Sequence, residues 1–245
     1  MDHSDDQGYV YLAAGLFNLG TNFQNAYIAN RLEEHGYRCF LPQRDGFEVA
    51  RFVEFLQQAK DNDATRRYAS EIAHFVPYYL DLGYFLSRSI AVVASLDDPL
   101  DSGMIVEISY ARLSNLPVIG FRSDIRSPLG NVSEEIAINP FPVRQCDVYI
   151  KAATPTGDLA SVYRATDAFV ETIESELRAR VPLKHNRMAT SDNPVLQDIV
   201  KGAAILFDGL SRPFGTDAMR EIANRYVQHK DFFDAQQPKF LAINT

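Results

Sequence analysis

Short apolar runs and amphipathic stretches alternate along the chain from residue 9 to residue 152. The apolar runs carry β-branched and aromatic residues and predict strands, whereas the stretches between them have helical periodicity. The predicted strands are residues 9–17, 37–43, 89–96, 117–121 and 146–152. The predicted helices between them are residues 22–36, 47–60, 68–86 and 102–115. The run SIAVVASL at 89–96 is the most strand-like and is expected to be the central strand.

Residue types at the helix ends agree with this alternation. Thr21 is expected to cap the first helix and Gly36 to end it, and Pro77 is expected to interrupt the helix before the central strand. Strands that alternate with helices pair in parallel through right-handed crossovers. The pattern therefore predicts an α/β fold, a flavodoxin-like three-layer sandwich with a five-stranded parallel sheet.

The strand signals stop after residue 153. Helical periodicity continues at about residues 158–180, 194–210 and 216–233, which predicts an all-helical C-terminal extension. We therefore expect a catalytic domain over 1–153 and the extension over 154–245. The polar connector 181–194 is a second candidate for the boundary.

Charge and composition exclude several classes of partner. The net charge of −8 would repel a phosphate backbone, so no nucleic acid polymer is expected to bind. No apolar run approaches the roughly 18 residues of a membrane span, and the acidic N-terminus does not resemble a secretory signal. The two cysteines, Cys39 and Cys146, are isolated, which favours the cytoplasm. The histidines show no metal-binding spacing, and no phosphate-binding loop is present, so we expect no metal or other cofactor.

In parallel sheets of this type ligands bind beyond the carboxyl ends of the strands, so residues that follow strands are the candidates for a site. Gly15 and Phe17 follow the first strand; they could admit and stack on a planar group, or they could be an ordinary turn and a core residue. Gln43 follows the second strand and could read the edge of a heterocycle, or could lie in a surface turn.

The richest segment is SLDDPLDSGMIVE, which follows the central strand. Asp101, or Ser102 beside it, is a candidate helix cap, and Gly103 would leave room for a ligand at the helix start. Glu107 lies among apolar residues, where a carboxylate must be paired, exposed or functional. A solvated helix edge explains Glu107 as well as catalysis does.

Two further polar residues have simple structural explanations beside functional ones. Asp81 lies in an apolar and aromatic helix and could be its one surface aspartate. Asn139 precedes a proline, as turn residues often do. Asp81, Asp101 and Glu107 with Gln43 nevertheless form a set suited to a glycosidic carbon, with one carboxylate as nucleophile and another as acid.

Five short motifs, YLAAGLF, LPQ, YYLD, DSGMIVEISYA and AINPF, occur in an order that resembles the nucleoside 2-deoxyribosyltransferase family from Tyr11 to about Phe141. The family motif D-x-G-x-x-x-E-x-G-x-A reads Asp101, Gly103, Glu107, Ser109 and Ala111 here. Ser109 departs from the usual glycine but keeps a small side chain.

The resemblance implies an enzyme that moves 2-deoxyribose between bases through a deoxyribosyl-glutamate, in nucleoside salvage. It implies Glu107 as the nucleophile, Tyr11 as the hydroxyl that orients it and Asp81 as the proton carrier. For binding deoxynucleosides and free nucleobases it implies the residues Phe17, Gln43, Asp101, Gly103 and Asn139. Asn139 would enter the neighbouring subunit's site, so a homo-oligomer with shared sites is implied.

Two other functions remain to be weighed. An N-glycoside hydrolase of deoxynucleosides or their 5′-monophosphates would use a similar glutamate with water as acceptor. A phosphorylated signalling receiver is suggested by the fold, the acidic cluster and Lys151, but receivers need acidic residues after the first strand. That loop reads AAGLFN in this chain, which disfavours a receiver.

Overall fold

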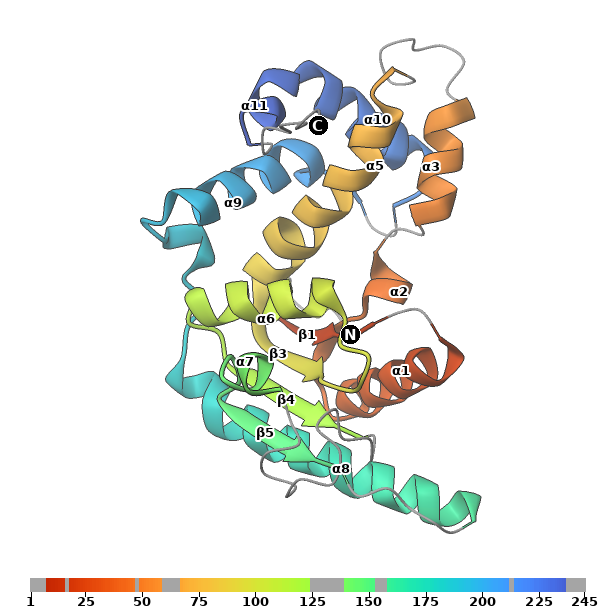
Figure 1. Ribbon diagram of the computed structural model, residues 1–245, viewed down its shortest axis with the longest axis vertical. Coiled ribbons are helices and arrows are strands. Elements are labelled where there is room, and N and C mark those ends of the chain that lie inside the picture. The colour runs from red at the N-terminus through yellow and green to blue at the C-terminus, as the bar shows by residue number, and fades with distance from the viewer. Residues whose placement is uncertain are drawn as a thin grey trace, which may run out of the picture. The chain divides into compact units, whose positions relative to one another are not determined.

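The computed structural model describes residues 8–15, 18–46, 49–58, 67–123, 139–152, 158–211 and 214–236. Its centre is a five-stranded, all-parallel sheet with the strand order β2-β1-β3-β4-β5 (Figure 1). The strands are β1 (Tyr9–Ala13), β2 (Arg38–Phe40), β3 (Ser89–Ser95), β4 (Val118–Arg122) and β5 (Val148–Lys151). The predicted flavodoxin-like α/β fold is confirmed, and β3 is the central strand, as its sequence indicates.

The chain divides into two compact units. The sheet unit comprises Met1–Asp45 and Phe85–Ser191, and the helical unit comprises Gly46–Tyr84 and Asp192–Thr245. This division differs from the boundary expected near residue 153, because an internal segment joins the C-terminal helices and the helix after residue 158 stays with the sheet.

Helices cover both faces of the sheet, as a parallel sheet requires. The helices of the sheet unit are α1 (Leu19–Glu34), α2 (Pro42–Asp45), η2 (Leu86–Arg88), α6 (Ser102–Leu113), α7 (Pro140–Val143), α8 (Leu159–Arg180), η3 (Val181–Leu183) and η4 (Met188–Thr190). Figure 1 shows α1 and α8 on one side of the strands and α6 on the other.

The α8 helix completes the core on its side of the sheet. Its buried residues Phe169, Val170, Ile173 and Leu177 belong to the same apolar cluster as Leu12, Val93 and Phe121 of the strands and Ile28 and Leu32 of α1. The Phe169 ring meets the Phe121 ring edge to face, with centroids 5.0 Å apart. Burial of this stripe is the physical reason why α8 belongs to the sandwich and not to a separate extension.

The first helix begins earlier than its sequence suggests. Asn18 is the N-cap, because its backbone is extended and its side chain accepts a hydrogen bond from the Thr21 N–H at 2.8 Å. The expected cap Thr21 is therefore wrong; it lies in the first turn of α1. Gly36 is confirmed as the residue that ends the helix, and its φ of +90° is one that glycine adopts without strain.

The described helices of the helical unit are α3 (Val49–Gln58), α5 (Ala69–Tyr78), the π-helix η1 (Tyr79–Phe85), α9 (Pro194–Phe207), α10 (Thr216–Gln228) and α11 (Lys230–Ala235). Pro77 lies inside α5, so the expected interruption takes the form of a change from α to π geometry two residues later. A Cβ on Gly83 would lie 2.5 Å from that of Ala203, which shows how closely η1 and α9 pack. Within the described ranges, every helix is too short or too polar to cross a bilayer.

Both cysteines are free thiols within the sheet unit. Cys39 is buried in the core, and Cys146 lies against Gly120 of β4, where a Cβ would approach its sulfur to 2.5 Å. Glycine at position 120 therefore leaves the room that the Cys146 sulfur occupies. Burial raises the pKa of each thiol to about 12.

Candidate active site

A hydrogen bond between the sheet and α6 joins two of the predicted site residues. The Tyr11 hydroxyl of β1 donates to Oε1 of Glu107 on α6 at a distance of 2.7 Å. The two residues are 96 positions apart in the sequence, and the crossover through β3 brings them together. The structure thus places Tyr11 where it can orient one oxygen of the Glu107 carboxylate.

The surroundings fix the tyrosine and leave the carboxylate accessible. Tyr11 is fully buried, and its ring lies 5.1 Å from the Phe40 ring, which in turn stacks on Phe85. Glu107 is half-buried, while Met104 and Ile108 of the same helix are buried. A fixed donor beside a partly exposed carboxylate suits a nucleophile that must meet a substrate from solution.

The start of α6 is capped as the sequence predicts. Asp101 is the N-cap, and its Oδ1 accepts a hydrogen bond from the Met104 N–H at 2.7 Å. A Cβ on Gly103 would lie 3.0 Å from that same oxygen, so glycine leaves the cap undisturbed. Asp101 and Gly103 thus lie one to two turns before Glu107 on one helix.

The loop that leads into α6 contains two aspartates whose partners the sequence does not reveal. Asp97 accepts from the Ser123 N–H at 2.7 Å and from the Ser123 hydroxyl at 2.6 Å. Asp98 forms an ion pair of 2.7 Å with the buried Arg122. Sequence reasoning noticed this acidic cluster but missed its role, because Arg122 ends the next strand and Ser123 follows it.

Gln43 lies on α2, the one-turn helix that follows β2. It is exposed, and its Nε2 donates to the backbone carbonyl of Asn22 on α1 at 3.0 Å. In the described structure its side chain therefore ties α2 to α1, and reading a base edge would require this bond to be exchanged.

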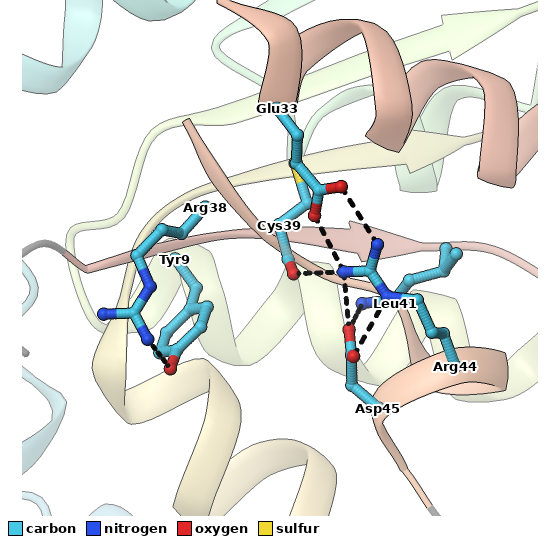
Figure 2. A network of polar contacts seen from close by, with 7 residues as sticks. All are labelled: Tyr9, Glu33, Arg38, Cys39, Leu41, Arg44 and Asp45. Atoms are coloured by element: carbon cyan, nitrogen blue, oxygen red, sulfur yellow. Dashed lines mark hydrogen bonds and ion pairs between the residues drawn. The ribbon is translucent and has the colours of Figure 1, made fainter. Parts of the chain in front are cut away.

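A polar network holds α2 in place. Figure 2 shows the Arg44 guanidinium donating two hydrogen bonds to Glu33, at 2.8 and 3.0 Å, and one to the Cys39 carbonyl, at 2.9 Å. Asp45 accepts from Arg44 and from the Leu41 N–H. Such a bidentate pair fixes orientation as well as distance, so the position of Gln43 is set by its neighbour in the chain.

Two more of the predicted residues lie on other elements. Asp81 is on η1 in the helical unit, where burial of its carboxyl group raises its pKa from 3.8 to about 7. Asn139 is the exposed N-cap of α7 and accepts from the Phe141 N–H. Phe17 lies outside the described residues. In the part of the chain that the structure describes, no three potential ligands gather as a metal site would require.

Comparison with known families gives a clear result. Residues 10–141 of the 245, more than half of the chain, match the model of nucleoside 2-deoxyribosyltransferase. The chain belongs to the nucleoside 2-deoxyribosyltransferase family. No curated protein matches the chain significantly. Enzymes of this family act on small nucleosides and nucleobases, and the matched range includes both Tyr11 and Glu107.

We predict that Tyr11→Phe lowers deoxyribosyl transfer by about 10- to 100-fold, because Glu107 then loses its positioned donor. Steady-state rates with a deoxynucleoside and a second base measure the effect. Tyr9→Phe is the matched control: it removes a hydroxyl from the same strand, one that accepts a hydrogen bond from Arg38. Equal rates in the two variants would contradict an orienting role for Tyr11.

Proposed function

We propose that the protein exchanges the base of 2-deoxynucleosides through a covalent ester between deoxyribose and Glu107. The observation that carries the proposal is the 2.7 Å hydrogen bond from the buried Tyr11 hydroxyl to a half-buried carboxylate, within the range that matches the family. An enzyme that exchanges bases must hold the sugar after one base leaves and before another enters. A carboxylate nucleophile provides such an intermediate.

The reaction has two displacements at C1′. In the first, a Glu107 oxygen bonds to C1′ as the C1′–N bond to the base breaks, and the departing base nitrogen takes a proton. In the second, a nitrogen of the incoming base bonds to C1′, releases the Glu107 carboxylate and gives up a proton. Two inversions restore the original configuration, and the enzyme returns to its starting state.

Asp81 is proposed as the group that gives and takes this proton. A catalytic acid works best when its pKa lies near the working pH, and burial brings the pKa of Asp81 to about 7. Its position on a π-helix is consistent with such a role, since π-turns occur often at functional sites.

The other substrate contacts follow from the family resemblance. We propose that Asp101 and Gly103 face the sugar, that Gln43 and Phe17 contact the base, and that Asn139 enters the site of a neighbouring subunit. Exchange of bases with conservation of the deoxyribose suits nucleoside salvage. Hydrolysis is the alternative outcome, in which water takes the place of the second base; product analysis with one nucleoside and two bases distinguishes the two.

We predict that Glu107→Ala and Glu107→Asp both abolish transfer, since alanine removes the nucleophile and aspartate withdraws it by about 1 Å. A 2′-fluoro-arabino nucleoside, whose fluorine slows the second displacement, should leave its sugar on the peptide that contains Glu107. Mass spectrometry of the quenched enzyme locates the label.

The control is Glu176→Gln, which changes a carboxylate on α8 that pairs with Arg180, outside the matched range. It should label and transfer as the parent does. A label on Asp81 or Asp101, or near-normal transfer by Glu107→Ala, would show that the nucleophile is assigned wrongly.

We predict that Asp81→Asn lowers turnover by about 100-fold while changing the pH dependence of stability. A carboxyl group with a raised pKa favours the folded state below pH 4, and this contribution is lost as the pH rises through 7. Asparagine never ionises, so the variant should melt higher than the parent at pH 8 and about equally at pH 4. Asp217→Asn changes an exposed carboxylate of the same unit and keeps Asp81, so this variant should melt as the parent does at both pH values.

We predict that mixing inactive Glu107→Ala with inactive Asn139→Ala restores activity, because in a mixed dimer one site receives both intact residues. Random exchange of subunits gives about a quarter of parental activity. Refolding the two variants together, with mass measurement of the active species, checks this. A fully active monomer, or no recovery on mixing, would rule out shared sites.

A further inference from the structure

Three consecutive residues of the loop before α6 are bonded to the end of β4. The Leu96 N–H donates to the Phe121 carbonyl at 2.7 Å, which extends the pairing of β3 and β4 by one residue. Asp97 then binds Ser123 and Asp98 binds Arg122, both through their side chains. Charged side chains thus continue the contact between the strands after the backbone ladder ends.

These contacts are partly shielded from solvent and extend into the next layer. Arg122 is only 4% exposed, although it carries a charge, so its ion pair with the partly exposed Asp98 is less screened than a pair between two surface residues. The Ser123 hydroxyl, which donates to Asp97, also accepts from Nε2 of Gln24 on α1 at 2.9 Å. The loop is therefore held by the end of β4 and, through Ser123, by α1 on the side of the sheet away from α6 (Figure 1).

This loop determines where α6 begins. Only two residues separate Asp98 from the N-cap Asp101, and Glu107 lies six residues beyond the cap. The helix is a stiff rod that contacts β1, β3 and β4. A shift or rotation at its first turn therefore moves the Glu107 carboxylate relative to the Tyr11 hydroxyl, which is fixed in the sheet.

We propose that Asp97 and Asp98, held by Ser123 and Arg122, are positioning residues for Glu107. The inference rests on the proposed function, because the step that Asp97 and Asp98 would assist is the attack of Glu107 on C1′. In this role they fix the start of α6 so that the carboxylate meets C1′ at the distance that attack requires. A misplacement of about 1 Å at a reacting group is enough to cost about 100-fold in rate.

The test separates positioning from simple stabilisation. A structural contact, when lost, lowers the fraction of active molecules, whereas a positioning contact lowers the rate constant of each active molecule. The probe is a 2′-deoxy-2′-fluoro-arabino nucleoside, with the label on Glu107 followed over time by mass spectrometry. The rate constant at saturating probe reports attack by Glu107, and the final amplitude reports the active fraction.

The main variant is Asp98→Asn, which keeps the size of the side chain and removes the charge that pairs with Arg122. We expect the saturating rate constant to fall by about 10-fold or more, with an amplitude near that of the parent. Half-saturation by the probe should change by less than about 2-fold, since a positioning residue acts on the rate of attack and not on binding.

The matched control is Glu174→Gln on α8, which covers the other side of the sheet. Glu174 is also a carboxylate in an ion pair, here with His35 and Arg178, and neither partner lies on α6. Losing its charge should weaken the contact of α8 with the end of α1 and leave the rate constant within about 2-fold of the parent value. If Asp98→Asn does not fold, Ser123→Ala replaces it: the Asp97 contact through the backbone N–H survives, and a fall of about 3-fold is expected.

A parental rate constant in Asp98→Asn, or in Ser123→Ala where that variant is used, overturns the proposal, whatever the amplitude. An equal loss of rate in Glu174→Gln also overturns it, because the effect would then be one of general stability. If the parent itself carries no label on Glu107, the proposed function fails and this inference fails with it. The labelling of the parent therefore distinguishes the two failures.

Discussion

A buried hydroxyl group must find a hydrogen-bond partner, and for Tyr11 the structure supplies Glu107. The tyrosine ring is needed to fill the layer between β1 and α6, where it packs on Phe40. Its polar end then requires an acceptor on a helix that is otherwise apolar on this side, beside Met104 and Ile108. One interaction thereby links the register of the sheet to the rotation of α6.

Much of the fold could be predicted because its signals are local. The run at 89–96 contains enough β-branched and small residues to be recognised as the central strand, and β3 covers Ser89–Ser95. Asp101 was recognisable as a cap because its partner is three residues away. Where two local signals competed, the prediction failed. Asn18 and Thr21 both suit a cap, and it is the Asn18 side chain that accepts a hydrogen bond from a backbone N–H of the first turn, that of Thr21.

What could not be predicted depends on contacts between distant segments. Ser123 lies 26 positions from Asp97, and nothing in either sequence neighbourhood announces the pairing. The packing of α8 on the sheet depends on residues such as Phe121, whose ring contacts Phe169 of α8. The environment of Asp81 is equally a product of folding, since periodicity alone allows a surface aspartate there. Most candidate residues were singled out by their positions and types, the resemblance to a family added Tyr11 and the roles, and the structure shows how some of these residues are held.

The two cysteines have a practical consequence. Thiols react with maleimides and with disulfides as thiolates, and a pKa of about 12 leaves Cys39 and Cys146 almost entirely protonated at neutral pH. The two natural thiols should therefore react slowly with reagents that label a single introduced cysteine. A fluorophore or spin label attached to an introduced cysteine on an exposed helix would report from that one position, with both natural thiols left in place.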